Sequence, residues 1–320
     1  MPDVRILDFE QVSRLLPMDE CIRAMEEVLA ALARDELFNP LRRAERPPGA
    51  SSLMGLMTAY RAGGPYALKA VVVAPENAAR GLDPHQGTVT LFDGVTGIPR
   101  AILNASAITA IRTAAVSAVA TRALMRSDAE TLAILGTGHQ AGPHLEAHRA
   151  VHDWGRVVRW SRTYVEEAAT AEEAVRVADV VVTVTSAREP IVERAWLKPG
   201  THITAAGSSI PTTRELDSQT MADASLFVDR RESTLNEAGD YLFPMREGLI
   251  GPEHIKAELG EVLIGAVPGR ESDSELTVFK SLGLAVEDLA AAEHVRRRAE
   301  AEGVGTVVPL CSRRSAGRGR

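Results

Sequence analysis

A glycine-rich turn near the middle of the chain has the spacing of a phosphate-binding loop. Residues 131–142 read TLAILGTGHQAG, so a short apolar run leads into a GxGxxA pattern, and a segment that can form a helix follows. In such loops the first glycine permits a tight turn, the second lets the backbone approach a pyrophosphate, and the small third residue allows close helix–strand packing. The helix N-terminus also offers free N–H groups to phosphate. We therefore predict a dinucleotide site, rather than an ordinary glycine turn, made by Gly136, Thr137, Gly138, His139, Gln140 and Ala141.

The end of the next predicted strand indicates which dinucleotide is bound. Residues 158–163 read VRWSRT, and the first acidic residue after them is Glu166. NAD-selective sites usually carry an acid here to hold the ribose 2′-hydroxyl, whereas arginine pairs with a 2′-phosphate. Ser161, Arg162 and Thr163 therefore favour NADP(H). NAD(H) is the alternative if Arg162 is only a solvated residue at a strand end.

Several cations stand in surroundings that are otherwise nearly free of charge. Lys69 lies in the apolar segment ALKAVVV, Arg112 lies in a long alanine-rich stretch, and Arg42 and Arg43 lie in a proline-rich extended segment. A buried cation is costly unless an anion pairs with it. A dehydrogenase must hold its anionic substrate beside the nicotinamide, so we interpret these cations as a substrate pocket. Solvent-facing positions on a strand and a helix are the alternative.

Three histidines recur four residues apart after the glycine loop, at His144, His148 and His152. One helical face with this spacing could bind zinc, but no glutamate completes an HExxH pattern. We therefore expect a solvated surface stripe and no metal site. The sequence contains no GxSxG motif, so hydrolysis through an activated serine has no support.

Length and composition set the outer limits. The chain has 320 residues, enough for about two domains, with 45% hydrophobic and 25% charged residues and a net charge of −7. We expect neither a nucleic-acid nor a membrane partner, because there is no basic excess and no evident apolar run long enough to span a bilayer. Cys21 and Cys311 form no CxxC motif, and residues 1–20 lack a signal peptide. We therefore expect a cytoplasmic protein.

The first third of the chain predicts one helix and a group of strands. Apolar residues recur at helical spacing over 22–32, and Pro17 suits a first helical position. Strand-like runs follow at Leu53–Tyr60, Ala67–Val73, Thr88–Phe92 and Pro99–Leu103, with turn signals between the last two. Consecutive strands with short connections predict an antiparallel sheet.

The pattern changes to alternating elements in the second half. Residues 106–126 predict a long helix with Ser106 as its N-cap, and residues 284–303 predict another. Between them, apolar strands alternate with helical or loop segments at Thr131–Leu135, Val157–Trp160, Asp179–Val184, His202–Ala206 and Ala224–Val228. This alternation is typical of a parallel sheet with crossover helices. We interpret the last nine residues, SRRSAGRGR, as a frayed tail rather than a basic partner-binding arm.

Long segments of the chain resemble the ornithine cyclodeaminase/mu-crystallin family. The similar blocks run in order from residue 67 to residue 292 and include LAILGTGHQA, GSSIPTTREL, LFVDRRES, EAGDYLFP and TVFKSLGLAVEDLAAA. The resemblance implies an α/β protein with a doubly wound Rossmann domain over 116–292. It also implies an α+β substrate-binding and dimerisation domain over 1–115 with 293–320. NAD(P)-linked chemistry at the Cα of an amino or imino acid, in a homodimer, is implied as well.

The resemblance also assigns residues. Lys69 matches the active-site lysine, and Arg112, in TAIRTAA, matches the arginine that binds the substrate carboxylate. Arg42 matches a second such arginine, although Arg43 and Arg46 are alternatives. Thr113, Ser281 and Gly283 are expected to contribute to the cofactor site.

One departure from the family pattern bears on the substrate. Ornithine cyclodeaminases carry an aspartate in a block similar to GSSIPTTREL, and alignment on Pro211 and Glu215 places Ser209 there. The resemblance then favours reduction of small 2-imino acids, of the ketimine or Δ1-pyrroline-2-carboxylate type, with Ser209 in the substrate site. Cyclodeamination of ornithine with NAD, an amino-acid dehydrogenase such as alanine dehydrogenase, and a nucleotide-binding protein without turnover are the alternatives.

Overall fold

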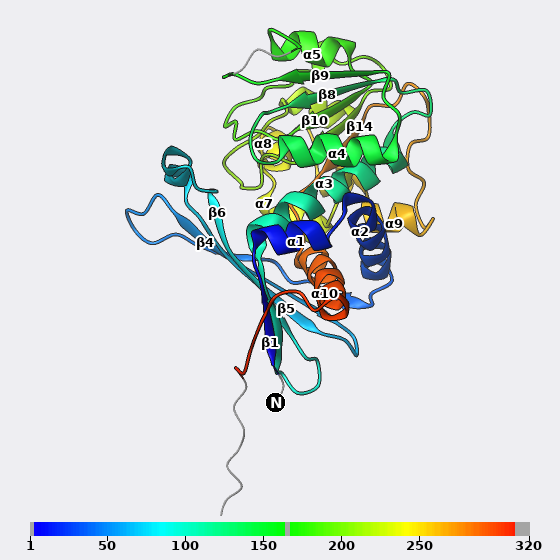
Figure 1. The fold of residues 1–320 in the computed structure, drawn as a ribbon. Helices are drawn as coiled ribbons and strands as arrows, with labels where there is room; N and C mark the ends of the chain where they lie inside the picture. Colours follow the sequence, from blue (N-terminus) through cyan, green and yellow to red (C-terminus); the bar gives the residue numbers. More distant parts are fainter. Residues whose placement is uncertain (1–2, 164–166, 311–320) are drawn as a thin grey trace, which may run out of the picture.

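The computed structural model describes residues 3–163 and 167–310, and within these ranges the chain forms two lobes (Figure 1). The lower lobe contains an eight-stranded sheet and the upper lobe a seven-stranded sheet. Helix α3 (Ala105–Leu124) runs between them and contacts strands of both. This arrangement confirms the predicted fold class, a doubly wound parallel sheet joined to a second α+β unit.

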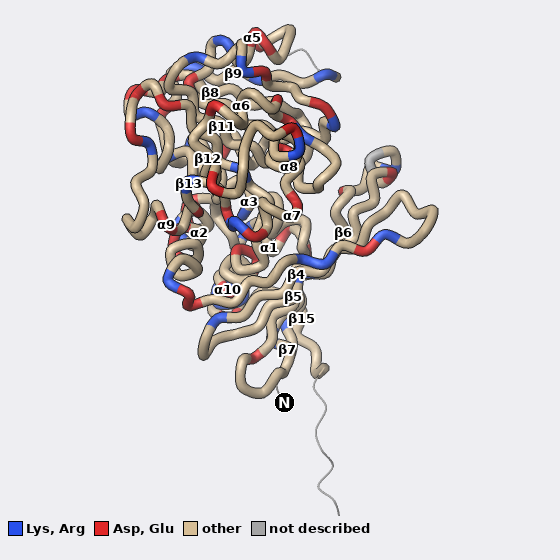
Figure 2. The backbone as a smooth tube through the Cα atoms, turned by 180° about the vertical axis from the view of Figure 1, so that it is seen from behind, with Lys and Arg blue, Asp and Glu red and all other residues tan. Residues whose placement is uncertain are grey.

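Four long antiparallel strands form most of the lower sheet, as the short connections predict. They are β4 (Leu53–Arg61), β5 (Tyr66–Val73), β6 (His85–Phe92) and β7 (Pro99–Asn104). At one edge β1 (Val4–Leu7) pairs parallel to β7, and β15 (Thr306–Val308) pairs antiparallel to β1. At the other edge β2 (Leu37–Phe38) and β3 (Arg43–Glu45) pair with β4, so part of the predicted extended segment is a short strand. Figure 2 shows β4 and β6 extending from the body as an arm.

Three helices of the lower lobe pack near this sheet. They are α1 (Phe9–Leu15), α2 (Met18–Ala33) and α10 (Ala285–Glu302), of which α10 contacts β4, β5 and β6 directly. The sequence suggested Pro17 as the first helical residue of α2. Pro17 is instead the N-cap residue, and the helix begins at Met18. The returning helix α10 packs in the lower lobe, and β15 follows it.

The start of α3 differs from the prediction. Its N-cap is Asn104, whose side chain accepts from the N–H of Ala107 at 3.0 Å, so the prediction of Ser106 is wrong. The Ser106 hydroxyl instead donates to the carbonyl of His85. By length and composition α3 could cross a membrane, yet most of it is buried inside the molecule, as a core helix is.

The upper sheet is parallel throughout. Its order is β13-β12-β14-β11-β10-β8-β9. The strands are β8 (Thr131–Leu135), β9 (Arg156–Trp160), β10 (Val180–Thr183), β11 (His202–Ala205), β12 (Ser225–Val228), β13 (Ile255–Glu258) and β14 (Thr277–Lys280). The chain passes from β8 to β9 on one side and then to β10 on the other, which creates the crevice where α/β sheets bind ligands.

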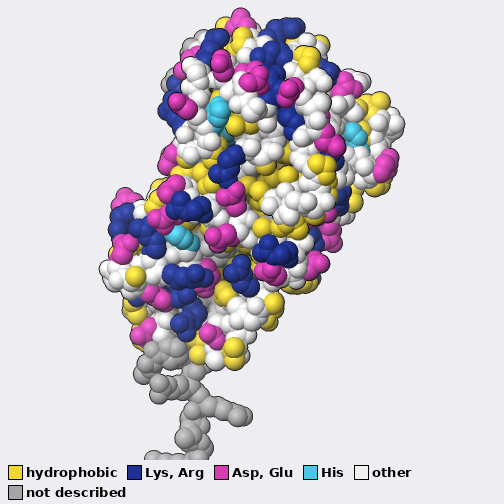
Figure 3. Space-filling view, turned by 90° about the vertical axis from the view of Figure 1, so that its right-hand side faces the viewer, with side chains coloured by type: hydrophobic (Ala, Val, Ile, Leu, Met, Phe, Trp, Pro, Cys, Tyr) yellow, Lys and Arg dark blue, Asp and Glu magenta, His cyan; other side chains and the backbone are white. Residues whose placement is uncertain are grey.

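Short helices connect these strands. They are α4 (Ala141–Val151), α5 (Ala171–Val177), α6 (Ser218–Asp223), α7 (Arg231–Glu237), α8 (Gly239–Arg246) and α9 (Leu259–Leu263). The predicted domain boundaries, after residue 115 and after residue 292, fall inside α3 and α10, so the division of the chain into two domains stays a prediction. On the face shown in Figure 3, acidic and basic side chains lie interspersed above and below a central group of hydrophobic side chains.

Candidate active site

A cleft of about 610 Å³ lies where the two lobes meet. Its upper wall consists of loops that follow β8, β10, β11 and β14, which are carboxyl ends of parallel strands. Its lower wall includes side chains of β4 and β5 and of α3. The apolar part of the lining includes Leu53, Met57, Val71, Val73 and Leu282.

The glycine loop has the geometry that phosphate binding requires. Gly136 has a φ of +128°, and a Cβ there would lie 2.7 Å from the carbonyl oxygen of Val184, so only glycine fits. Next to Gly138 there is open space, and α4 begins at Ala141. The buried Oε1 atom of Gln140 lines the cleft without a hydrogen-bond partner. An open glycine and an unsatisfied polar atom at a helix N-terminus fit a bound dinucleotide.

Other predicted nucleotide residues lie at different distances from the cleft. His139 and Gln140 line it, as does Thr113, whose hydroxyl donates to the carbonyl of Thr109 at 2.6 Å. Thr137 is exposed. Ser161 is buried, whereas Arg162 and Thr163 are exposed after β9, and the lining residues include none of these three. Glu166 lies outside the described residues.

Lys69 is a buried amine that reaches the cleft from β5. Its side chain is 4% exposed, and Nζ lies 3.0 Å from Oδ1 of Asp288 in α10. The solvent-facing alternative is therefore wrong. Burial lowers the pKa of Lys69 to about 8, against the opposing effect of Asp288. Near neutral pH such an amine can both give up and take a proton.

Arg112 is equally buried and is held by two acids. Its Nη1 donates to Glu287 at 2.7 Å, and its Nε donates to Asp288 at 3.2 Å. Nη2 has no acceptor among the described residues, and the side chain lines the cleft. Burial raises the pKa of Glu287 to about 7. Sequence reasoning missed both acids, because α10 contains several acids and three consecutive arginines, as a solvated helix does.

The turn between β14 and α10 is fixed from β12. Oδ2 of Asp229 accepts from the N–H groups of Leu282 at 2.6 Å and Gly283 at 2.7 Å. Gly283 has a φ of +80°. Ser281 is buried and lines the cleft, and its N–H donates to the carbonyl of Ala205 at 3.0 Å.

Arg42 comes from the segment before β3 and bridges the two lobes. Its Nη2 donates to the carbonyl of Ser209 at 2.6 Å and lies 3.0 Å from Glu237, while Nη1 donates to the carbonyl of Leu282 at 3.2 Å. Arg46 also lines the cleft, but its Nη1 donates to Ala50 and Ser51, and Arg43 is exposed and is not a lining residue. Ser209 itself lines the cleft.

The histidine stripe is not a solvated surface, so that expectation is wrong. His144 and His148 are fully buried and face α3, where their Nε2 atoms lie 3.0 Å from the hydroxyls of Ser117 and Thr121. His152 is half-buried. Burial lowers the pKa of His144 to about 3 and of His148 to about 4, so both are neutral. Within the described ranges no group of three or more potential ligands is arranged to hold a metal.

The geometry thus joins a dinucleotide loop to a buried lysine and arginine in one cleft. Residues 3–303 match the model of the ornithine cyclodeaminase/mu-crystallin family. The chain belongs to this family. The match spans both lobes, so the family assignment covers the nucleotide loop and the cations together.

Members of the family with curated names are similar over most of the chain. A Δ1-pyrroline-2-carboxylate reductase of Bacillus cereus is 37% identical over 319 residues, covering 94% of this chain and 98% of that protein. The ketimine reductase mu-crystallin of Mus musculus is 43% identical over 256 residues, covering 76% and 79%.

Solved structures of the family have the same fold. A Δ1-pyrroline-2-carboxylate reductase of Thermococcus litoralis, in complex with NADH and L-proline, has a TM-score of 0.90 and 34% identity, covering 94% of this chain and 99% of that chain. An archaeal alanine dehydrogenase dimer with bound NAD has a TM-score of 0.91 and 32% identity, covering 97% and 100%. Binding of a nicotinamide nucleotide is therefore common to these neighbours.

Proposed function

We propose that this chain is an NAD(P)H-dependent reductase of small 2-imino acids, of the ketimine or Δ1-pyrroline-2-carboxylate type. The observation that carries the proposal is the shared cleft, in which Lys69 and Arg112 lie with His139 and Gln140 of the nucleotide loop. The named reductases in the family support the same reaction class. When bound, the nucleotide supplies a hydride, so the protein has to bind and orient the imine and provide one proton.

Arg112 and Lys69 have separate tasks in this reaction. Nη2 of Arg112 is directed to the substrate carboxylate, since Nε and Nη1 are already held by Asp288 and Glu287. Lys69, with its pKa lowered to about 8, donates a proton to the imine nitrogen as the imine carbon accepts the hydride, and the product is an amine. Apolar side chains of β4 and β5 surround the methylene groups of the substrate.

A turnover screen tests the reaction. Oxidation of NADPH and NADH is followed with Δ1-pyrroline-2-carboxylate, Δ1-piperideine-2-carboxylate and pyruvate with ammonia, and ammonia release from ornithine is followed with NAD. Turnover of the two cyclic imines supports the reductase. Turnover of pyruvate alone identifies an alanine dehydrogenase instead, the activity named for one structural neighbour. Steady ammonia release from ornithine identifies a cyclodeaminase.

We further propose that NADPH is preferred over NADH. The C-terminal end of β9 lies beside the glycine loop, because the N–H of Gly136 donates to the carbonyl of Trp160 at 2.8 Å. Arg162 follows two residues later and is exposed, and an arginine at this strand end suits a ribose 2′-phosphate. The substitution Arg162→Ala should weaken NADPH binding more than NADH binding. An equal loss for both nucleotides would remove this support.

Pairing with a second copy of the chain is also proposed. The outer face of the lower sheet carries apolar side chains on adjacent strands, including Met54, Tyr66 and Val72, each 39–46% exposed. One structural neighbour was solved as a dimer. Sedimentation of the wild-type chain and of Val72→Asp tests this, with a dimer expected only for the wild type.

A further inference from the structure

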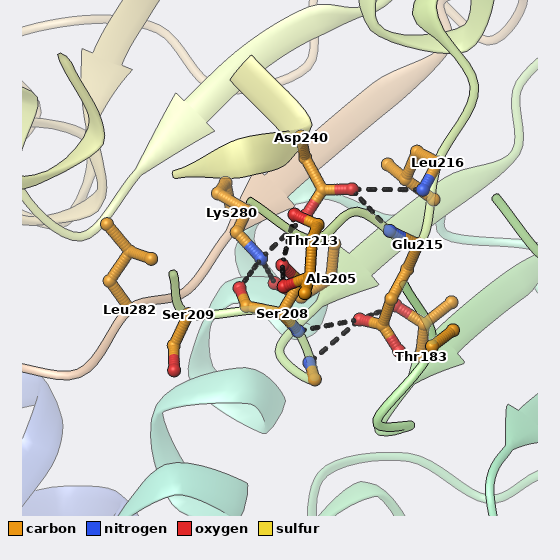
Figure 4. A network of polar contacts seen from close by, with 12 residues as sticks. Thr183, Ala205, Ser208, Ser209, Thr213, Glu215, Leu216, Asp240, Lys280 and Leu282 are labelled. Carbon is orange, nitrogen blue, oxygen red and sulfur yellow. Dashed lines mark hydrogen bonds and ion pairs between the residues drawn. The ribbon is translucent and has the colours of Figure 1, made fainter. Parts of the chain in front are cut away.

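Three fully buried charged residues lie together behind the upper wall of the cleft (Figure 4). They are Lys280 at the end of β14, Asp240 in α8, and Glu215 in the segment after β11. Nζ of Lys280 lies 3.0 Å from Oδ2 of Asp240 and donates to the carbonyls of Ala205 at 3.1 Å and Ser208 at 2.5 Å. The buried ammonium group thus has two carbonyl acceptors and a carboxylate counter-ion, as a buried lysine requires.

The two acids accept from backbone N–H groups, and Glu215 also accepts from the hydroxyls of Thr183 at 2.8 Å and Thr185 at 2.7 Å. Oδ1 of Asp240 accepts from the N–H groups of Glu215 at 2.7 Å and Leu216 at 2.9 Å. The Glu215 carboxylate accepts from the N–H of Thr185 at 2.8 Å and that of Gly207 at 2.8 Å. The loops after β10 and β11 are thus tied to one buried centre, and both loops line the cleft.

The loop after β11 connects the buried charges to Arg42 through two successive carbonyl groups. Its carbonyl at Ser208 accepts from Lys280, and the next carbonyl, at Ser209, accepts from Nη2 of Arg42 at 2.6 Å. In Figure 4 the Ser209 side chain points away from the buried charges. Neither Lys280, Asp240 nor Glu215 is among the described residues that line the cleft, so any effect on substrate must act through the loop.

We propose that Lys280, paired with Asp240, is a positioning residue for the imino-acid end of the cleft. It fixes the peptide between Ser208 and Ser209, and thereby fixes the guanidinium of Arg42 and the wall against which the substrate lies. This inference rests on the proposed function, because it assigns Arg42 and the 206–210 loop to the imino acid. Its signature is weaker binding of the imino acid at nearly unchanged nucleotide affinity.

The test variant removes the pair as a unit, Lys280→Met with Asp240→Asn, so that no buried carboxylate is left unpaired. As a control, the chain offers a second lysine–aspartate pair at the amino ends of β8 and β10, where the lysine is 40% exposed. There Nζ of Lys198 lies 3.0 Å from Asp179 and 3.0 Å from the carbonyl of Val177, and Asp179 accepts two backbone N–H groups. The control variant is Lys198→Met with Asp179→Asn.

Three quantities are measured for each protein: the KM of the cyclic imine, the Kd of NADPH, and the Kd of pyrrole-2-carboxylate as an unreactive carboxylate. The 280/240 variant should raise the KM and the carboxylate Kd at least tenfold, with the NADPH Kd changed less than about threefold. The 198/179 control should leave all three within about twofold, although its melting temperature falls. Equal KM and carboxylate Kd in the two variants would overturn the positioning role.

The outcomes separate the two proposals. If the wild type does not reduce imines but binds pyrrole-2-carboxylate, the proposed function fails and the carboxylate Kd alone decides the role of Lys280. If the wild type neither reduces imines nor binds pyrrole-2-carboxylate, both proposals are wrong. Where the 280/240 variant does not fold, Glu215→Gln replaces it, because it keeps the side-chain volume and loses acceptor strength toward Gly207. An unchanged KM and carboxylate Kd in a folded Glu215→Gln protein would then overturn the inference.

Discussion

Gly283 lies directly against the guanidinium group of Arg112. A Cβ at position 283 would come within 2.5 Å of Nη1 and 2.7 Å of Nη2. The same turn is held by Asp229, and the helix that follows supplies Glu287 and Asp288 to Arg112. The end of the Rossmann sheet therefore sets the position of a cation that belongs to the substrate side of the cleft.

The substitution Gly283→Ala should impair substrate binding as well as stability. Its φ of +80° disfavours any side chain, at a cost of about 1–2 kcal/mol, and the new methyl group displaces Arg112. Gly303 is a matched control, because its φ is +68° and a Cβ there meets open space. We expect Gly303→Ala to lose only the backbone cost in denaturant unfolding, and Gly283→Ala to lose that cost plus the cost of moving Arg112. Only Gly283→Ala should raise the KM of the imine, and equal KM values would contradict the coupling.

Arg112 cannot be tested by simple truncation. Arg112→Leu would leave the buried carboxylates of Glu287 and Asp288 without a counter-ion, which costs about 3–5 kcal/mol. Arg112→Lys retains the positive charge but loses the planar fork, so it should fold and still bind NADPH. We expect its kcat/KM for a carboxylated imine to fall at least a hundredfold. A near-native kcat/KM at wild-type stability would exclude carboxylate binding by Arg112.

Reduction should depend on the ammonium form of Lys69. Because burial lowers its pKa to about 8, the proton donor is present below that pH and is lost above it. The kcat/KM for the imine should therefore be level at pH 6.5–7.5 and fall about tenfold per pH unit above pH 8. Lys69→Met should lose the activity and bind NADPH normally. A rate that rises through pH 8–9 would assign the acid to another group.

Acid should destabilise the protein through its buried histidines. His144 and His148 have pKa values of about 3 and about 4 in the folded state against 6.5 for a free histidine, so the unfolded chain binds protons first as pH falls. Stability is thus complete above about pH 6.5 and declines below it, by about 1.4 kcal/mol per pH unit for each histidine. Urea unfolding from pH 7.5 to pH 5 measures this slope. His148→Gln should reduce it by one histidine's share, whereas a flat profile would show that the histidines are not buried neutral.

Local pattern predicted much of the fold because most strands are short apolar runs bounded by turns. In the upper sheet, the strands β13 and β14 were missed. Their sequences, IKAE and TVFK, carry charges that break the apolar pattern. In β14 the charge is Lys280, which the sequence cannot place beside Asp240, 40 positions away. Such a strand becomes recognisable only when its buried partner is known.

Site residues were predicted where a charged residue stands in an apolar segment, as Lys69 and Arg112 do. Site residues were missed where a charged residue stands among other charged residues. Glu287 and Asp288 lie in a helix that also contains three consecutive arginines, and their burial depends on packing against α3 and β5. His144 and His148 were wrongly predicted to be solvated, because the hydroxyls that satisfy them in the interior, those of Ser117 and Thr121, lie on another helix.

Ser209 should decide between imine reduction and cyclodeamination. Cyclisation of ornithine requires the side-chain amine to be held near the oxidised carbon and deprotonated there, which suits a carboxylate within hydrogen-bond reach. Ser209 lines the cleft, but a hydroxyl carries no charge at neutral pH, whereas a cyclic imine already contains its ring and needs no such group. We therefore expect NADPH-dependent reduction of a cyclic 2-imino acid and negligible proline from ornithine.

The substitution Ser209→Asp should lower the kcat/KM for the cyclic imine, because the new carboxylate repels the carboxylate of the substrate. The control is Ser208→Ala, one residue away, because the Ser208 hydroxyl bonds to Thr213. Ammonia release from ornithine by the wild type, sustained by catalytic amounts of NAD, would show that a serine suffices and that the chain is a cyclodeaminase.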